Sequence, residues 1–113
     1  MKLLIIGSRT ISGFDLKGYI PPETTMIISG GAEGIDSEAE HYADRHRLSK
    51  LILRPPYQLF GRAAPIRRNE EMVDYADAVL AIWDGVSRGT ANTIAYAQKK
   101  EKPLTVIRVD AAQ

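Results

Sequence analysis

The chain has 113 residues and a formal net charge of +1, from 15 Lys plus Arg and 14 Asp plus Glu. This length suits one domain with its own core, and the lack of cysteine excludes disulfides, thiolate metal sites and a cysteine nucleophile. The near-neutral charge disfavours a surface that coats nucleic acid, and the short apolar runs disfavour a signal segment or membrane span. We therefore expect a single soluble, cytoplasmic domain over residues 1–113 that has no membrane partner.

Five short apolar runs predict strands, at residues 3–6, 25–28, 51–53, 78–83 and 104–109. The runs are continuous rather than alternating, which is typical of parallel strands covered on both faces. The glycine- and proline-rich stretch "TISGFDLKGYIPPET" between the first two runs predicts only a short helix.

The later connections have helical spacing, with apolar or small residues three and four positions apart. The three predicted stripes are Ile35, Ala39, Tyr42, Ala43 and His46, then Ile66, Asn69, Val73 and Ala76, and then Ala91, Ile94, Ala95 and Gln98. This alternation predicts a single Rossmann-like, doubly wound three-layer α/β sandwich with a five-stranded, mainly parallel sheet. In such sheets ligands bind beyond the carboxyl ends of the strands, where the strand order reverses.

Small and polar residues follow the predicted strands, in positions that suit a phosphate. Glycine-rich turns at helix N-termini expose backbone N–H groups to an anion, and hydroxyl side chains add further donors. The predicted ligand-binding residues are Gly7, Ser8, Arg9, Ser29, Gly30, Gly31, Tyr57, Asn69, Gly85, Ser87, Gly89 and Thr90. A purely structural interpretation is that these glycines only make tight turns between strands and helices.

Two charged residues are candidate catalytic groups. Arg68 could clamp a phosphate, and Asp84 could engage a ribose hydroxyl or polarise a water, while Tyr57 could stack on a base. The structural alternatives are a solvated helix face for Arg68 and a turn before Gly85 for Asp84. His41 and His46 lie five positions apart without a third ligand, so no metal site is predicted, although Mg²⁺ could accompany a phosphorylated ligand.

The segments "GSR", "SGGAEGID", "GRAAPIRRNEEM", "ADAVLAIWDGVSRGT" and "KPLTVI" together resemble the SLOG superfamily. This Rossmann-like group includes the LOG phosphoribohydrolases and the core of the DNA-processing protein DprA, and the chain is most similar to its small YspA-type, cpYpsA-related branch. The resemblance implies a pocket for a nucleotide or nucleotide-derived ligand and a homo-oligomer.

Within this resemblance, Arg68 matches the catalytic arginine of the LOG enzymes, and Gly85, Gly89 and Thr90 match their phosphate loop. Thr93 stands where those enzymes have a catalytic glutamate. Threonine has no carboxylate to stabilise an oxocarbenium-like transition state, so Asp84 or Glu70 would have to supply one.

Three functions are compatible with these residues. The first is binding of a phosphorylated nucleoside or nucleotide-derived molecule, as a sensor or as an N-glycosidic or phosphate-ester hydrolase. The second is DprA-like binding of single-stranded nucleic acid by a rim of arginines. The third is a scaffold with a vestigial pocket.

Overall fold

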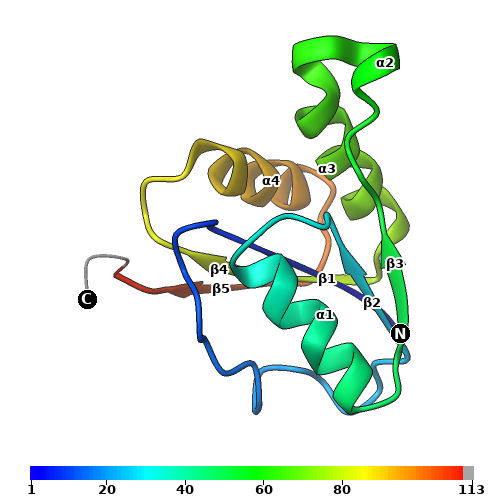
Figure 1. Ribbon diagram of the computed structural model, residues 1–113, viewed down its shortest axis with the longest axis vertical. Helices are drawn as coiled ribbons and strands as arrows, with labels where there is room; N and C mark the ends of the chain where they lie inside the picture. The colour runs from blue at the N-terminus through cyan, green and yellow to red at the C-terminus, as the bar shows by residue number, and fades with distance from the viewer. Residues whose placement is uncertain (111–113) are drawn as a thin grey trace.

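Five parallel strands form one sheet in the order β3-β2-β1-β4-β5 in the computed structural model, which describes residues 1–110 (Figure 1). The strands are β1 (Lys2–Gly7), β2 (Met26–Ser29), β3 (Ser49–Ile52), β4 (Ala78–Trp83) and β5 (Leu104–Arg108). The predicted doubly wound α/β fold is confirmed, and the sheet is parallel throughout. Because all strands run the same way, their carboxyl ends meet at one edge of the sheet.

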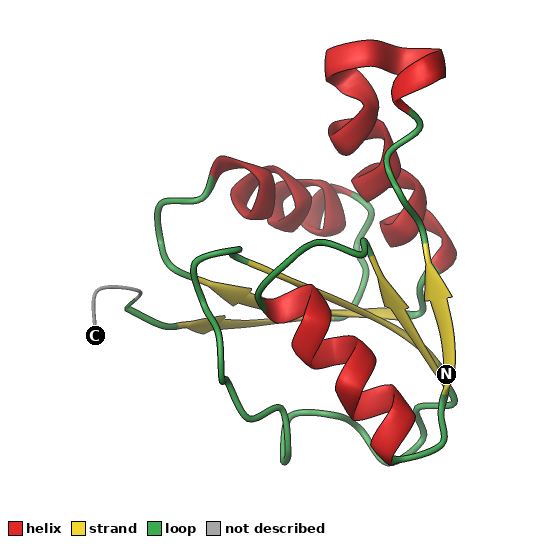
Figure 2. Cartoon of the chain, viewed as in Figure 1, coloured by secondary structure: helices red, strands yellow, loops and turns green. Residues whose placement is uncertain are grey.

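Helices cover both faces of this sheet (Figure 2). Helix α1 (Ile35–Arg45) packs on one face, and α3 (Ala64–Tyr75) and α4 (Arg88–Lys99) pack on the other. Between β3 and α3, the short helix α2 (Tyr57–Phe60) and a 3₁₀ turn, η1 (Gly61–Ala63), form a projecting arm that is seen at the top of Figure 1. None of the helices in residues 1–110 is long and apolar enough to cross a membrane.

Side chains of the central strands alternate between two hydrophobic clusters. Leu3 and Ile5 of β1 pack toward α1, whereas Leu4 and Ile6 pack toward α3 and α4. Both sets are buried, which explains why the sequence of this strand is continuously apolar. The sheet thus holds its strand ends rigidly between two packed layers.

The connection from β1 to β2 differs from its prediction. Residues 8–25 form turns and no helix, so the expected short helix is wrong. Gly13 and Gly18 have positive φ, and Pro21 lacks a backbone N–H, which together prevent a regular helix. Ile11 and Leu16 from this irregular segment are nevertheless buried against the α1 side of the sheet.

The predicted helix stripes have unequal outcomes. Ile35, Ala39 and Ala43 are buried on α1 as expected. The stripe predicted for α4 is wrong, because its buried residues are Thr90, Thr93 and Ala97. On α3 the buried residues are Ala64, Arg68, Met72 and Val73, so of its predicted stripe only Val73 is buried within the helix.

Candidate functional site

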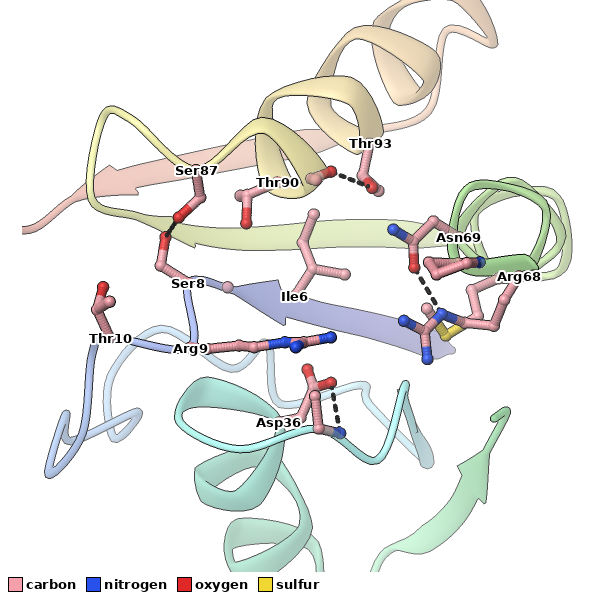
Figure 3. Close-up of a pocket in the computed structure, with 15 residues that line it drawn as sticks. Ile6, Ser8, Arg9, Thr10, Asp36, Arg68, Asn69, Ser87, Thr90 and Thr93 are labelled. Carbon is pink, nitrogen blue, oxygen red and sulfur yellow. Dashed lines mark hydrogen bonds between the residues drawn. The ribbon is translucent and has the colours of Figure 1, made fainter. Parts of the chain in front are cut away.

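A cavity of about 300 Å³ opens at the carboxyl ends of β1 and β4 (Figure 3). The chain passes from β1 to β2 and β3 on one side, and then returns to place β4 and β5 on the other. The reversal of strand order therefore falls between β1 and β4, where ligands bind in sheets of this kind. The predicted residues that line the cavity are Gly7, Ser8, Arg9, Arg68, Asn69, Ser87, Gly89 and Thr90.

Arg68 is held in the wall of the cavity by hydrogen bonds to the protein. Its Nη1 donates to the carbonyl oxygens of Gly30 at 2.7 Å and Leu53 at 3.1 Å, and its Nε donates to Asn69 Oδ1 at 2.7 Å. Within residues 1–110, Nη2 has no such partner. Arg68 is only 6% exposed, so it does not lie on a solvated helix face. Burial lowers its pKa, but an arginine stays protonated at neutral pH.

Gly30 leaves room for this arginine. A Cβ atom at Gly30 would lie 2.6 Å from Arg68 Nη1 and 3.0 Å from Asp36 Oδ2. Any side chain there would displace the guanidinium or the carboxylate. The glycine that the sequence assigned to phosphate binding therefore also determines where Arg68 can sit.

Arg9 brings a second guanidinium to the same cavity. It follows β1 directly, and Figure 3 shows it reaching toward the guanidinium of Arg68. Its positive charge further lowers the pKa of Arg68, after the larger effect of burial. Two cations that converge across a hollow favour an anion between them.

The N-terminus of α4 forms the opposite wall. Backbone N–H groups in the first turn of a helix have no partner within the helix, and the helix dipole favours negative charge there. Ser87, Gly89 and Thr90 line the cavity at this turn, and no side-chain cap bond occupies it. In Figure 3 the Thr90 side chain points into the cavity, so its hydroxyl is a further donor for an anion.

Asp84 holds the loop before α4 and does not line the cavity. Its Oδ1 accepts hydrogen bonds from the backbone N–H groups of Val86 at 2.9 Å and Ser87 at 2.8 Å, and its Oδ2 lies 2.9 Å from Ser87 Oγ and 3.0 Å from Thr10 Oγ1. These donors, led by the Val86 N–H, hold the pKa of Asp84 well below its usual range. The turn alternative describes this carboxylate better than a catalytic role does.

The remaining predicted residues lie beside the cavity rather than in it. Gly30, Gly31 and Tyr57 line a second hollow of about 480 Å³, which shares Arg9, Ala32 and Arg68 with the first. Ser29 is buried beneath the glycine turn, where its Oγ accepts a hydrogen bond from Gly31 N at 3.3 Å.

Gly85 is also outside the cavity, at a positive φ of 86°, and a Cβ there would lie 2.5 Å from Arg108 Nε. Its role is therefore to make the turn after β4.

Asp36 is a charged lining residue that sequence reasoning did not assign to the site. It is the second residue of α1, it is 8% exposed, and it faces the cavity next to the end of Arg9 in Figure 3. Burial raises its pKa, although the N–H of Ala32 and the charges of Arg68 and Arg9 oppose that rise. An acidic residue at a helix start ordinarily predicts a capping role. The position of Asp36 after the glycine turn that follows β2, at the same sheet edge as the other site residues, could have indicated that it lines the cavity.

Thr93 also lines the cavity, yet its hydroxyl is engaged by its own helix. Thr93 Oγ1 donates to the Gly89 carbonyl oxygen at 2.9 Å. His41 and His46 are not part of the cavity. Residues 1–110 contain no group of three or more histidine, cysteine or acidic side chains that could hold a metal ion.

Comparison with known proteins finds a short similarity. The chain is 42% identical over 40 residues to the uncharacterized SPbeta prophage-derived protein YoqJ of Bacillus subtilis (strain 168), a match that spans 35% of this chain and 23% of that protein. No protein-family model and no solved structure match the chain. The fold and the cavity are therefore the basis for a functional proposal.

Proposed function

We propose that this protein binds a phosphorylated nucleoside or another nucleotide-derived small molecule in the cavity between β1 and β4. The convergence of Arg9, Arg68 and the N-terminus of α4 on one cavity carries the proposal. Two guanidinium groups, exposed N–H groups and the Thr90 hydroxyl together suit a phosphate, because charge-assisted hydrogen bonds are the strongest available to the protein.

The adjacent hollow accommodates the rest of such a ligand. It continues from the cavity past Arg9 and Arg68 to Arg54 and the exposed ring of Tyr57. An aromatic ring beside an arginine offers a stacking surface for a base. A ligand with a phosphate at α4 and a base near Tyr57 would use both hollows.

The geometry supports binding more directly than hydrolysis. Asp84 is occupied by the loop that it holds, and the Thr93 hydroxyl is occupied by the Gly89 carbonyl. Neither of these two residues presents a free carboxylate to the cavity, whereas Asp36 does line it. We propose binding as the function that the arginines and α4 support, and turnover is to be measured in the same experiment.

The test is a thermal-shift screen against nucleoside mono-, di- and triphosphates, NAD and ADP-ribose, followed by calorimetric titration and product analysis of each hit. Replacing Arg68 or Arg9 with alanine should raise the Kd of a hit by about 10- to 100-fold, because each loses a charge-assisted hydrogen bond to phosphate.

Arg67→Ala is the matched control for both variants. Arg67 is next to Arg68 in sequence, but it is exposed, and its guanidinium lies 5.6 Å from the Phe60 ring centroid, on the projecting arm. This variant should keep the wild-type Kd. Arg9 donates no side-chain hydrogen bond and forms no ion pair within residues 1–110, so Arg9→Ala tests the site without removing a bond of either kind.

A lack of any thermal shift, or an unchanged Kd in both Arg9→Ala and Arg68→Ala, would refute the proposal. Binding of a single-stranded oligonucleotide that falls steeply with added salt would favour the nucleic-acid alternative instead. Light scattering in the same buffers checks the homo-oligomer that the superfamily resemblance implies.

A further inference from the structure

Asp36 is a buried carboxylate whose position is fixed at one oxygen. Its Oδ2 accepts a hydrogen bond from the Ala32 backbone N–H at 3.0 Å, in the turn that precedes α1. This hydrogen bond orients the side chain at the cavity wall, where Asp36 is only 8% exposed. The carboxylate is therefore aimed into the cavity by the same glycine-rich turn that accommodates Arg68.

The hydrogen-bonding capacity of Asp36 is largely unused. An ionised carboxylate can accept about four hydrogen bonds, and within residues 1–110 the Asp36 side chain accepts one, from Ala32 N. Neither Arg9 nor Arg68 forms an ion pair with it in that part of the chain. Asp84 is the opposite case, because four donors surround it.

A buried carboxylate with free lone pairs is costly unless a donor reaches it. A phosphate cannot be that donor, because both groups are negative. A cationic ligand group is disfavoured by the neighbouring charges of Arg9 and Arg68, which also line the cavity. Neutral hydroxyl groups donate hydrogen bonds without adding charge, and a sugar that is attached to a bound phosphate carries them.

We propose that Asp36 accepts hydrogen bonds from the sugar hydroxyls of the bound ligand and makes the site select ribose over deoxyribose. This inference rests on the proposed function, because it requires the phosphate to bind between the arginines and α4. It assigns Asp36 a specificity role, in contact with the ligand but without a bond-breaking step.

The experiment is calorimetric titration with ribose 5-phosphate, 2-deoxyribose 5-phosphate and inorganic phosphate. The wild-type protein should bind ribose 5-phosphate about 10-fold or more tightly than the deoxy compound, because the lost hydroxyl leaves a charged acceptor unpaired. Asp36→Asn should reduce this ratio to within about 3-fold, because a neutral amide oxygen is a weaker acceptor than a carboxylate.

Inorganic phosphate separates the two proposals. Asp36→Asn should bind it as tightly as the wild type or more tightly, because no like charge remains beside the anion. Glu38→Gln is the matched control, since Glu38 lies in the same first turn of α1 but outside the cavity, where it accepts a hydrogen bond from Gly13 N. This control should keep the wild-type preference for ribose.

Equal affinity of the wild type for the two sugar phosphates would overturn the inference even if Asp36→Asn failed to fold. A preference for ribose that survives in a folded Asp36→Asn protein would overturn it as well. In both cases binding of inorganic phosphate would leave the proposed function standing. If none of the three compounds bound, this inference would fail, and the nucleotide screen would decide the proposed function separately.

Discussion

The carboxylates of Asp84 and Asp36 have different roles, because they accept different numbers of hydrogen bonds from the protein. Asp84 satisfies its oxygens with backbone and hydroxyl donors from its own loop and from Thr10, whereas Asp36 keeps acceptor capacity at the cavity. The sequence suggested the reverse, because an aspartate after a central strand is a stronger functional pattern than one at a helix start. The number of hydrogen bonds that each carboxylate accepts distinguishes Asp84 from Asp36, and this number cannot be read from the sequence.

The role of Asp84 predicts a specific dependence on pH. Its pKa is lower in the folded protein than in the unfolded chain, so its stabilising effect is complete above the ordinary aspartate pKa and is lost as pH falls below about 4. Asp84→Asn should therefore lower the Tm at pH 7, because the amide offers weaker acceptors to Val86 and Ser87.

In a series of thermal melts, the Tm difference between Asp84→Asn and the wild type should stay constant from pH 7 to about pH 4 and should narrow as pH falls below that. Asp15→Asn serves as the control, since within residues 1–110 the exposed Asp15 side chain accepts a hydrogen bond only from the nearby Lys17 N–H. A Tm difference that is the same at every pH would show that the charge of Asp84 does not stabilise the loop.

Strand positions and buried helix faces were predictable where apolar packing alone determines them. The strand runs and the buried face of α1 follow from apolar spacing, because Ile35, Ala39 and Ala43 belong to one hydrophobic cluster of the core. The buried face of α4 was not predictable, because it turns Thr90 and Thr93 toward the cavity, and a pattern based on apolar residues counts them as exposed. Arg68 was assigned to the site, but it was left out of the predicted buried stripe of α3 for the same reason. Such departures are expected at functional sites.

The irregular connection between β1 and β2 contributes to the core as a helix would. Leu16 is 3% exposed, although its segment has no regular structure. Leu16→Ala should lower the free energy of unfolding by about 3 kcal/mol, the usual cost of truncating a buried leucine. Leu59→Ala is the matched control, because Leu59 on the projecting arm is 78% exposed and should change stability by less than about 0.5 kcal/mol. Urea denaturation measures the free energy of unfolding of both variants. Equal losses of stability in the two variants would show that the irregular connection does not contribute to the core.

At the scale of the whole molecule, the site exists only when the sheet is assembled. Its wall groups come from residues as far apart as Gly7 and Thr93, from both sides of the strand reversal. Local segments could not hold these groups together, because Arg9, Arg68 and α4 come from distant parts of the chain that the sheet and the packing of α3 against α4 bring together. A ligand of this cavity must therefore bind the folded state and not the unfolded chain.

This assembly predicts how inorganic phosphate affects unfolding. At about 100 times its Kd, phosphate should raise the free energy of unfolding by about 2.7 kcal/mol. The midpoint of urea unfolding should then rise, while the dependence of the free energy on urea concentration stays the same.

The single tryptophan, Trp83, reports on the site directly, because its Nε1 donates to the Ser87 carbonyl oxygen at 3.1 Å. Its fluorescence and the far-UV circular dichroism should change together, since the site and the fold are lost in one transition. At the same phosphate concentration Arg9→Ala should lose about half or more of the phosphate effect, whereas Arg67→Ala should retain it. A fluorescence transition that precedes the loss of secondary structure would instead mean that the loop before α4 opens independently of the sheet.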